Sequence, residues 1–293
     1  MKSKQMILYA GILTSALITG LMIGCDSGNS TGQGRLNLHI TDAPVDGADN
    51  VWIEFTGVEI KAGSETIDIT YDAPKTIDLL ALTAGAAELI VDDQVLPAGQ
   101  VEWIRLKVTE ANSSIIVDGM QHDLQIPSGE QNGLKLNRPI TIPENGVATF
   151  TIDFDLRKSV HQNSNGYTLR PTLRLVDNST DGALQGSFPT RYCKNINSAA
   201  VYVYAGSGVT ANDLGSTIEP VTTASVTVIS LGEIVSYEYT VAFLPAGEYT
   251  VANTCDASID TLELGDEVQF ISTSNVTIVA GQTTVKNFEV QER

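Results

Sequence analysis

The sequence predicts an all-β protein built from two tandem β-sandwiches. Apolar and polar residues alternate with a period of two in one segment after another, which is typical of half-buried strands. No segment after residue 24 carries a sustained helical period. A polar, turn-forming stretch at residues 177–182 separates two series of such segments, so we expect one sandwich on each side of it.

The first series begins with residues 35–41, where Leu36, Leu38 and Ile40 share one face. Asp118-Gly119 tolerates positive φ, so residues 115–126 are predicted to form a hairpin. One short helix is expected around residues 77–91, which are rich in Leu and Ala but interrupted by Gly85. The remaining alternating segments of this series are residues 51–56, 67–71, 101–108, 150–155 and 173–176.

The second series shows the same alternation and a weak internal repeat. Leu-Pro-Ala-Gly occurs at residues 96–99 and again at residues 244–247, each time directly before a strand. Proline fixes φ and glycine allows a sharp turn, so both segments predict the same kind of turn. The expected strands are residues 199–204, 224–230, 235–244, 248–252, 268–272, 275–279 and 284–290.

The first 24 residues are typical of an export signal. Lys2 and Lys4 precede an uncharged apolar run at residues 6–24, which ends at Cys25. A membrane-spanning helix is the alternative, because the run has the length of a span. The polar stretch at residues 26–34 and the absence of a basic cluster after the run favour a cleaved signal peptide.

Residues 21–25, Leu-Met-Ile-Gly-Cys, resemble the lipobox of bacterial lipoproteins. The resemblance implies that Cys25 is acylated and becomes the first mature residue. We therefore predict a signal peptide at residues 1–24, a flexible tether at 25–34, and sandwiches at 35–178 and 183–293. The lipobox resemblance also implies that the protein lies outside the cytoplasm, in the bacterial cell envelope, on the outer rather than the inner membrane. Asp26, by contrast, resembles an inner-membrane retention signal of enteric bacteria.

The charge excludes nucleic acid as a partner. The chain has 17 Lys and Arg against 35 Asp and Glu, a net charge of −18, whereas phosphate backbones are bound by clustered cations. Removal of residues 1–24 takes away two lysines, which gives 15 − 35 = −20. Such a field repels anionic lipid and favours cations or basic partners; solubility outside the cytoplasm is the simpler explanation.

Once Cys25 is acylated, Cys193 and Cys255 remain as an even pair. In an oxidising compartment they are expected to form a disulfide, with two buried free thiols as the alternative.

The sequence holds no motif of a known enzyme class. It has no Gly-x-Ser-x-Gly elbow, no phosphate-binding Gly-x-x-x-x-Gly-Lys and no His-Glu-x-x-His. Asp153 and Asp155 lie two apart on one predicted strand, but such pairs arise by chance in an acidic chain. We therefore predict a non-catalytic protein, with a hydrolase as the least favoured alternative.

Two weak binding sites can be named. Asp42, Asp46 and Asp49 gather in one loop and offer the oxygen ligands that Ca²⁺ takes, although turn capping by aspartate explains them as well. Tyr202 and Tyr204 share one strand face and are predicted to form an exposed strip that stacks on sugar rings, with Val201 and Val203 facing the core. Tyr237 and Tyr239 continue into an apolar face and are expected to be buried.

Residues 34–177 resemble the bacterial lipoprotein family of domain of unknown function 4382. The resemblance lies in Ile40-Thr41-Asp42-Ala43-Pro44, in residues 51–60, in Ile77-Asp78-Leu79-Leu80, in the Leu-Pro-Ala-Gly turn and in the closing Leu169-Arg170-Pro171. Residues 243–251 and 279–284 are similar to carboxypeptidase-regulatory-like and transthyretin-like sandwiches, which implies an accessory or adhesive module. These resemblances imply a fold and a compartment but no reaction.

Taken together, the sequence predicts a lipid-anchored envelope protein that acts as a non-catalytic binding or surface-structural module. The alternative is a carbohydrate-binding or calcium-dependent adhesion accessory. Expected partners are the membrane, through the lipid anchor, and a glycan or another envelope protein; calcium is the one cofactor considered.

Overall fold

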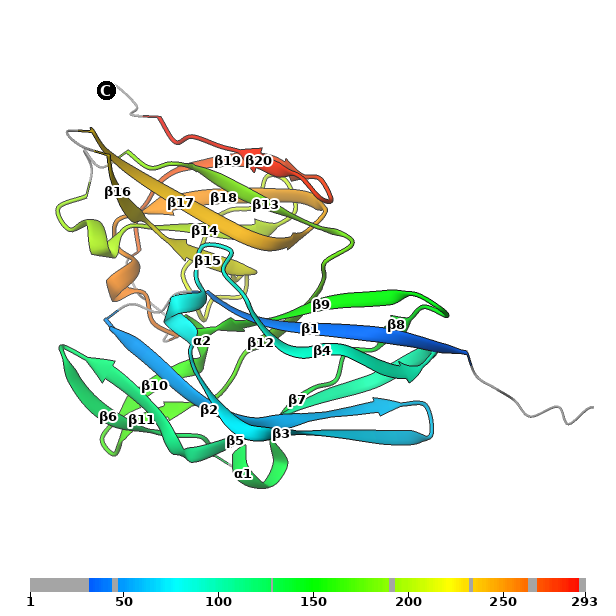
Figure 1. The fold of residues 1–293 in the computed structure, drawn as a ribbon. Helices are drawn as coiled ribbons and strands as arrows, with labels where there is room; N and C mark the ends of the chain where they lie inside the picture. The colour runs from blue at the N-terminus through cyan, green and yellow to red at the C-terminus, as the bar shows by residue number, and fades with distance from the viewer. Residues whose placement is uncertain are drawn as a thin grey trace, which may run out of the picture. The chain divides into compact units, whose positions relative to one another are not determined.

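Strands make up most of the chain, and they form four sheets (Figure 1). The computed structural model describes residues 32–43, 47–127, 129–189, 193–231, 234–262 and 268–289. Residues from Thr31 onward belong to one compact unit. The predicted all-β class is confirmed, whereas the signal peptide and the lipidated Cys25 lie outside the described residues.

Two sheets are built from residues 33–177. The first has the order β12-β9-β1-β4 and contains β1 (Gln33–Ala43), β4 (Glu88–Pro97), β9 (Val147–Asp155) and β12 (Leu173–Asp177). The second has the order β10-β11-β6-β5-β2-β3, with β7 and β8 also paired to β5. Its strands are β2 (Asn50–Ala62), β3 (Glu65–Asp78), β5 (Gly99–Val117), β6 (Met120–Gln125), β7 (Leu134–Leu136), β8 (Ile140–Ile142), β10 (Val160–Asn163) and β11 (Gly166–Leu169).

Two further sheets follow, from residues 181–285. One has the order β16-β17-β13-β20 and contains β13 (Asp181–Ser187), β16 (Thr227–Leu231), β17 (Ile234–Pro245) and β20 (Thr283–Val285). The other has the order β15-β14-β18-β19 and contains β14 (Ala200–Ala205), β15 (Thr222–Ser225), β18 (Gly247–Thr254) and β19 (Phe270–Ile278). The helical turns are η1 (Leu79–Leu82), α1 (Gly129–Asn132), α2 (Leu156–Ser159), η3 (Ile196–Ser198) and η4 (Ala257–Ile259).

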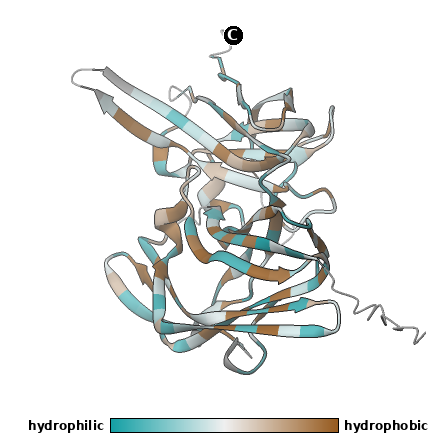
Figure 2. Cartoon of the chain, turned by 45° about the vertical axis from the view of Figure 1, so that its right-hand side comes forward, coloured by the Kyte–Doolittle hydropathy of each residue, from teal (hydrophilic) through white to brown (hydrophobic). Residues whose placement is uncertain are grey.

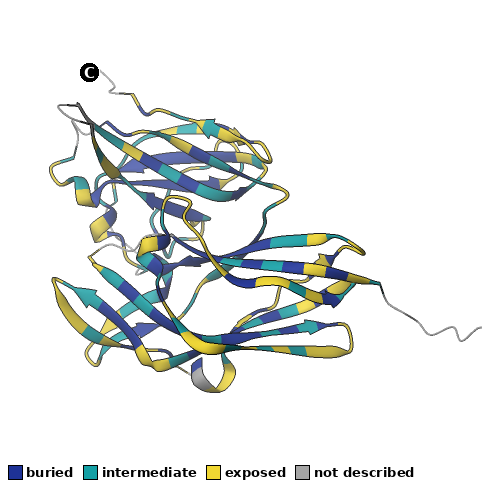
Figure 3. Cartoon of the chain, in the orientation of Figure 1, coloured by how far each residue is buried: buried dark blue, intermediate teal, exposed yellow. Residues whose placement is uncertain are grey.

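Each pair of sheets encloses an apolar core, and we call the two pairs the first and the second sandwich. Alternating hydrophobic and hydrophilic bands along the strands are visible in Figure 2, and buried and exposed residues alternate in the same way in Figure 3. In β1, Leu36, Leu38 and Ile40 are fully buried in the first core, as the alternation predicts. The second core contains Val201, Val203 and Val251.

The weak sequence repeat corresponds to a repeated strand plan. In both sandwiches the opening strand (β1 or β13) pairs antiparallel with the strand that ends at Leu-Pro (β4 or β17) and parallel with a later strand (β9 or β20). The Leu-Pro-Ala-Gly turn then leads into the opposite sheet, at β5 or β18.

Backbone hydrogen bonds repeat at the same spacing. Ala98 N donates to Gly32 O (2.6 Å), and Ala246 N donates to Thr180 O (2.9 Å). Both residues of the second bond lie 148 positions after those of the first, since 246 − 98 and 180 − 32 both equal 148. The two sandwiches therefore open with the same turn and the same pairing.

Local predictions were confirmed where turn chemistry is specific and failed where it is not. The hairpin at residues 115–126 is confirmed, because Asp118 and Gly119 both have positive φ between β5 and β6. The helix expected around residues 77–91 is wrong in length. It is a single 3₁₀ turn, η1, capped by Asp78, and the chain is extended again from Glu88. The strands expected at 268–272 and 275–279 are one continuous strand, β19.

Candidate binding surfaces and the junction between the sandwiches

The two cysteines of the second sandwich are joined as predicted. Cys193 and Cys255 form a disulfide with a Cα–Cα distance of 5.2 Å across 62 residues of sequence. Cys193 stands just before η3, and Cys255 directly follows β18. The bond therefore ties the segment that enters β14 to the far end of its neighbour β18.

The acidic loop that was considered for calcium is described in part. Asp42 is buried at the end of β1, where it lies opposite Phe154 in register, and Asp46 is outside the described residues. Asp49 is exposed, and its Oδ2 accepts a hydrogen bond from Gly119 N at 2.9 Å. Asp49 thus holds the turn between β5 and β6, which is the capping role that the sequence left as the alternative. Among the described residues, no group of three or more His, Cys, Asp or Glu is placed to hold a metal ion. The calcium site stays a prediction.

The exposed aromatic strip is wrong. Tyr202 is 0% exposed and Tyr204 is 1% exposed, although Val201 and Val203 do face the core between the sheets, as expected. The outer face of this sheet is also covered. Tyr202 and Tyr204 pack there in a separate cluster with Leu214, Ala252 and Ala257. A strand with apolar residues on both faces is typical of burial on both sides, and β14 has this composition (Ala-Val-Tyr-Val-Tyr-Ala). Tyr239 is buried, as predicted.

The buried tyrosine hydroxyls are hydrogen-bonded. Tyr202 Oη donates to Asp260 Oδ2 at 2.5 Å, and Asp260 Oδ1 accepts from Leu214 N at 3.0 Å. Arg157 of α2 lies on the same tyrosine, with Nη1 3.4 Å from the hydroxyl and the guanidinium carbon 5.6 Å from the ring centroid. Burial raises the pKa of Asp260, and the hydrogen bond from Tyr202 opposes this shift.

This network joins the two sandwiches, since α2 follows β9 whereas Tyr202 and Asp260 belong to the second half. Lys158, the next residue of α2, adds a second link. Its Nζ lies 2.9 Å from Glu219 Oε2, 2.8 Å from Pro220 O and 3.8 Å from Asp155 Oδ2. Nothing in the spacing of the sequence brings Arg157 to Tyr202, so sequence reasoning missed this contact.

The two carboxylates that were considered for catalysis have structural partners. Arg174 Nε donates to Asp153 Oδ2 at 3.0 Å, and Asp155 Oδ1 accepts from Lys158 N at the start of α2. Burial raises the pKa of both aspartates, and the neighbouring cations oppose the shift. Each carboxylate is held in a buried ion pair, so removal of its cation would leave a buried charge uncompensated.

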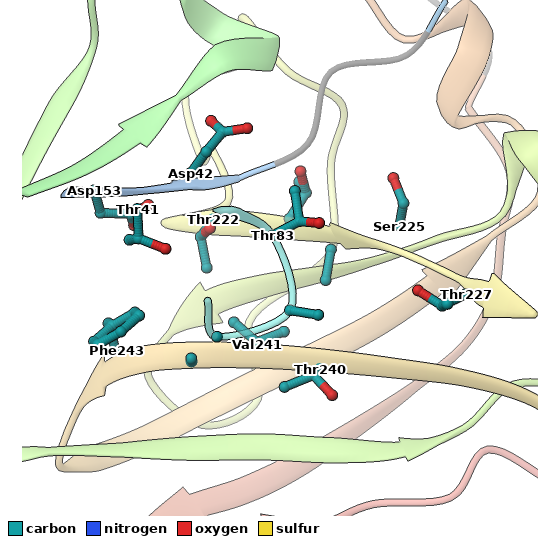
Figure 4. A pocket seen from close by; sticks show the side chains of 15 residues that line it. Thr41, Asp42, Thr83, Asp153, Thr222, Ser225, Thr227, Thr240, Val241 and Phe243 are labelled. Carbon is teal, nitrogen blue, oxygen red and sulfur yellow. The ribbon is translucent and has the colours of Figure 1, made fainter. Parts of the chain in front are cut away.

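A small cavity of about 60 Å³ lies between the sandwiches (Figure 4). Thr41, Thr83 and Asp153 line it from the first half, and hydroxyl groups from β15, β16 and β17 line it from the second. Thr41 and Asp153 lie opposite each other in register and point to one side of their sheet, whereas Asp42 points to the other side. Thr223 Oγ1 is buried there and has no hydrogen-bond partner within the described ranges. The cavity has room for a few water molecules that would satisfy such hydroxyls.

Comparisons with solved structures give remote likenesses. The chain matches a leucine-rich repeat protein from Bacteroides thetaiotaomicron with 15% identity over 89% of this chain and 26% of that one, at a TM-score of 0.21. It matches a minor pilin of Streptococcus agalactiae with 11% identity over 88% of this chain and 99% of that one, at the same TM-score of 0.21. It spans 34% of the Bacillus anthracis TIE protein, at 12% identity over 88% of this chain and a TM-score of 0.21. Scores of this size carry no conclusion about this chain.

No curated protein matches the sequence. In the part of the chain that the structure describes, no helix is both long and apolar enough to span a bilayer.

The family comparison agrees with the motifs of the first half. Residues 33–171 match the model of the family described as "Domain of unknown function (DUF4382)", a range that runs from the start of β1 to just before β12. This range is just under half of the chain, and the resemblance of residues 183–293 to transthyretin-like sandwiches stays a prediction. Residues 33–171 thus match the DUF4382 family, which confirms the resemblance that the motifs from Ile40 to Pro171 predicted.

Proposed function

We propose that this chain is a lipid-anchored protein of the bacterial cell envelope and acts there as a non-catalytic binding or structural module. The observation that carries the proposal is the disulfide between Cys193 and Cys255. Disulfides persist in oxidising compartments and are rare in the cytosol, so the bond favours a folded part outside the cytoplasm. Since Cys193 and Cys255 pair with each other, Cys25 is the one cysteine of the sequence outside this disulfide.

Two further observations support the proposal. Cys25 stands in a lipobox-like sequence behind an apolar run and two lysines, which is the arrangement that an acylated N-terminus needs. In addition, the buried carboxylates Asp153, Asp155 and Asp260 are all engaged with cations or hydrogen-bond donors of the fold. We propose an outer-membrane location and an envelope protein or a glycan as the partner that the tethered sandwiches reach.

The anchor is tested by growing cells that express the full chain with an alkyne analogue of palmitate. The expected result is labelled protein in the membrane fraction, whereas a Cys25→Ala variant is unlabelled and leaves that fraction. A Cys193→Ala variant serves as the control, because it removes a cysteine without removing the acylation site. Label that persists in Cys25→Ala, or membrane association that survives loss of label, would refute the anchor. Separation of the membranes on a sucrose gradient then tests the outer-membrane location.

A further inference from the structure

The outward side of the second sheet carries an unusual set of side chains for so acidic a protein. Lys61 of β2 lies opposite Trp103 of β5, and Arg105 of β5 lies between Glu59 of β2 and Lys135 of β7. Lys107 follows on the same side of β5, since residues two apart in a strand share a face. We call Lys61, Trp103, Arg105, Lys107 and Lys135 the basic face.

The basic face is far less acidic than the rest of the chain. It holds four cations, and the carboxylates paired with them are Glu59, 2.7 Å from Arg105 Nη1, and Asp68, which pairs with Lys107. The sum is +4 − 2 = +2, against −18 for the whole chain. Glu65 and Glu102 are exposed at its rim, and including them gives a local sum of +4 − 4 = 0.

Two of the four cations have no carboxylate partner among the described residues. Lys61 Nζ donates to Ser64 O at 2.9 Å, and Lys135 Nζ lies 4.6 Å from the centre of the Trp103 ring. Arg105 lies on the same ring, at 5.0 Å. Neither lysine is neutralised, so both are available to an anion outside the chain.

The basic face begins at the end of the sandwich where the N-terminal segment joins it. Gly32 O accepts a hydrogen bond from Ala98 N, in the turn between β4 and β5, and Gln100 O accepts one from Gly63 N, at the tip of the β2–β3 hairpin. In Figure 1 the start of β1 and this hairpin lie on the same side of the molecule. Lys61 and Trp103 stand within three residues of these contacts.

The length of the chain before Gly32 sets the distance to the membrane. Gly32 is seven positions after Cys25, and an extended chain spans at most about 3.6 Å per position, so the reach is about 25 Å. If Cys25 carries the lipid, the basic face is therefore held close to the headgroups. A short tether converts a weak contact into an intramolecular one at an effective concentration in the millimolar range.

We infer that the basic face lies against the anionic phosphate headgroups of the bilayer that holds the lipid anchor. The inference rests on the proposed anchor at Cys25. Each Lys or Arg near an anionic bilayer surface strengthens binding about fivefold, and the contribution vanishes beyond a Debye length of about 8 Å. Trp103 fits the interface, where amphipathic rings concentrate.

The test uses the full lipidated chain in vesicles of phosphatidylcholine, with or without phosphatidylglycerol. Trp52 and Trp103 are the two tryptophans of the chain, so Trp52→Phe leaves Trp103 as the sole fluorescent reporter. The expected result is that Trp103 is shielded from aqueous acrylamide in the anionic vesicles and accessible in the neutral ones. High salt should restore access, because it screens the attraction.

Charge variants test which residues are responsible. Lys61→Gln with Lys135→Gln should weaken the shielded state about 25-fold, which is about fivefold for each lysine. Glu65→Gln with Glu102→Gln should strengthen it. Lys194→Gln with Lys286→Gln, which removes the same charge from the second sandwich, should leave it unchanged. Equal access to Trp103 in both vesicles, or shielding that persists in the Lys61/Lys135 variant, would overturn the inference.

The mass of the N-terminal peptide reports acylation separately. If the protein is acylated but Trp103 stays accessible, the inferred membrane contact of the basic face is refuted and the anchor proposal stands. If the chain is not acylated, the anchor proposal fails, and sedimentation with anionic vesicles at low salt then tests the face by itself. Failure to sediment, or equal sedimentation of the Lys61/Lys135 variant, refutes it in that case.

Discussion

Tyr202 carries the buried contact between the sandwiches. Replacement of Tyr202 by phenylalanine should lower the free energy of unfolding by about 2 kcal/mol, because it leaves the Asp260 carboxylate and Arg157 without the hydroxyl between them. The measurement is chemical denaturation of the full chain.

Tyr204→Phe is the matched control for Tyr202→Phe. Tyr204 Oη is equally buried but bonds to the backbone of Asn212, which is uncharged. Both hydrogen bonds of the Tyr204 hydroxyl, to Asn212 O and from Asn212 N, are neutral, and a hydrogen bond to a charged group is worth about twice a neutral one, so the Tyr204 variant should be the more stable of the two. The network assignment fails if both variants lose the same free energy.

The disulfide supports a second prediction for single residues. In the loop-entropy model, a bond that closes about 62 residues stabilises the native chain by up to about 4 kcal/mol. Cys193→Ser with Cys255→Ser should therefore lower the melting temperature, and the reductant dithiothreitol should lower that of the unsubstituted chain in the same way. The double variant itself should not respond to reductant; a response there would mean that reduction acts elsewhere.

At this scale the sequence predicted the cysteine pair and the inward Val201 and Val203, but it missed the burial of Tyr202 and Tyr204. Alternation distinguishes the two faces of a strand without showing whether a loop covers the second face. The cover here comes from Leu214, in the loop after β14, and from Ala257 and Leu262, which follow more than fifty residues after Tyr204. No local pattern in β14 contains that information, although its lack of charged residues favours burial on both sides.

Among the elements, the four-residue helix α2 connects the sandwiches. Lys158→Met should raise amide hydrogen exchange in α2 and around residues 219–223 and lower stability by about 2 kcal/mol, because the buried Asp155 loses a cation and Pro220 O loses its donor. Lys75→Met in β3 is the control, since Lys75 contacts Leu89 and Tyr71 of its own sandwich. Exchange that rises equally in both variants would contradict a linking role for α2.

Elements with specific turn chemistry could be predicted, and those fixed by distant contacts could not. Asp118-Gly119 and both Leu-Pro-Ala-Gly turns lie where the sequence places them, because proline fixes φ and glycine permits the conformations that a sharp turn needs. Residues 77–91 resemble a helix in composition but pair as strands on both sides of η1. Tertiary pairing overrides a weak helix propensity there.

For the whole molecule, the sequence predicted a net charge of −18 but not its distribution. Four cations from β2, β5 and β7 meet because strands distant in sequence pair in one sheet. Their separation along the chain, from Lys61 to Lys135, hides the cluster from any window of sequence. No window of sequence shows either that the carboxyl groups of Asp153, Asp155 and Asp260 become buried at the junction between the sandwiches.

Burial gives the whole chain an unusual dependence on pH. It raises the pKa of Asp153, Asp155, Asp181 and Asp260 above the ordinary value of 3.8. Between that value and the raised ones, the native chain binds more protons than the unfolded chain, so the free energy of unfolding should fall as pH rises through this window. His161 acts in the opposite direction, because burial and Arg170 lower its pKa from 6.5, but it is one group against four.

Denaturation measured from about pH 4.5 to about pH 7 should therefore show the highest stability at the acidic end, where partial neutralisation also relieves the repulsion among 35 acidic residues. Asp260→Asn should reduce the slope, because it removes one of the buried groups whose ionisation destabilises the native chain. Asp68→Asn, at a partly exposed position on β3, should leave more of the slope in place. Stability that rises steadily over this range would contradict raised pKa values for the buried aspartates in the native protein.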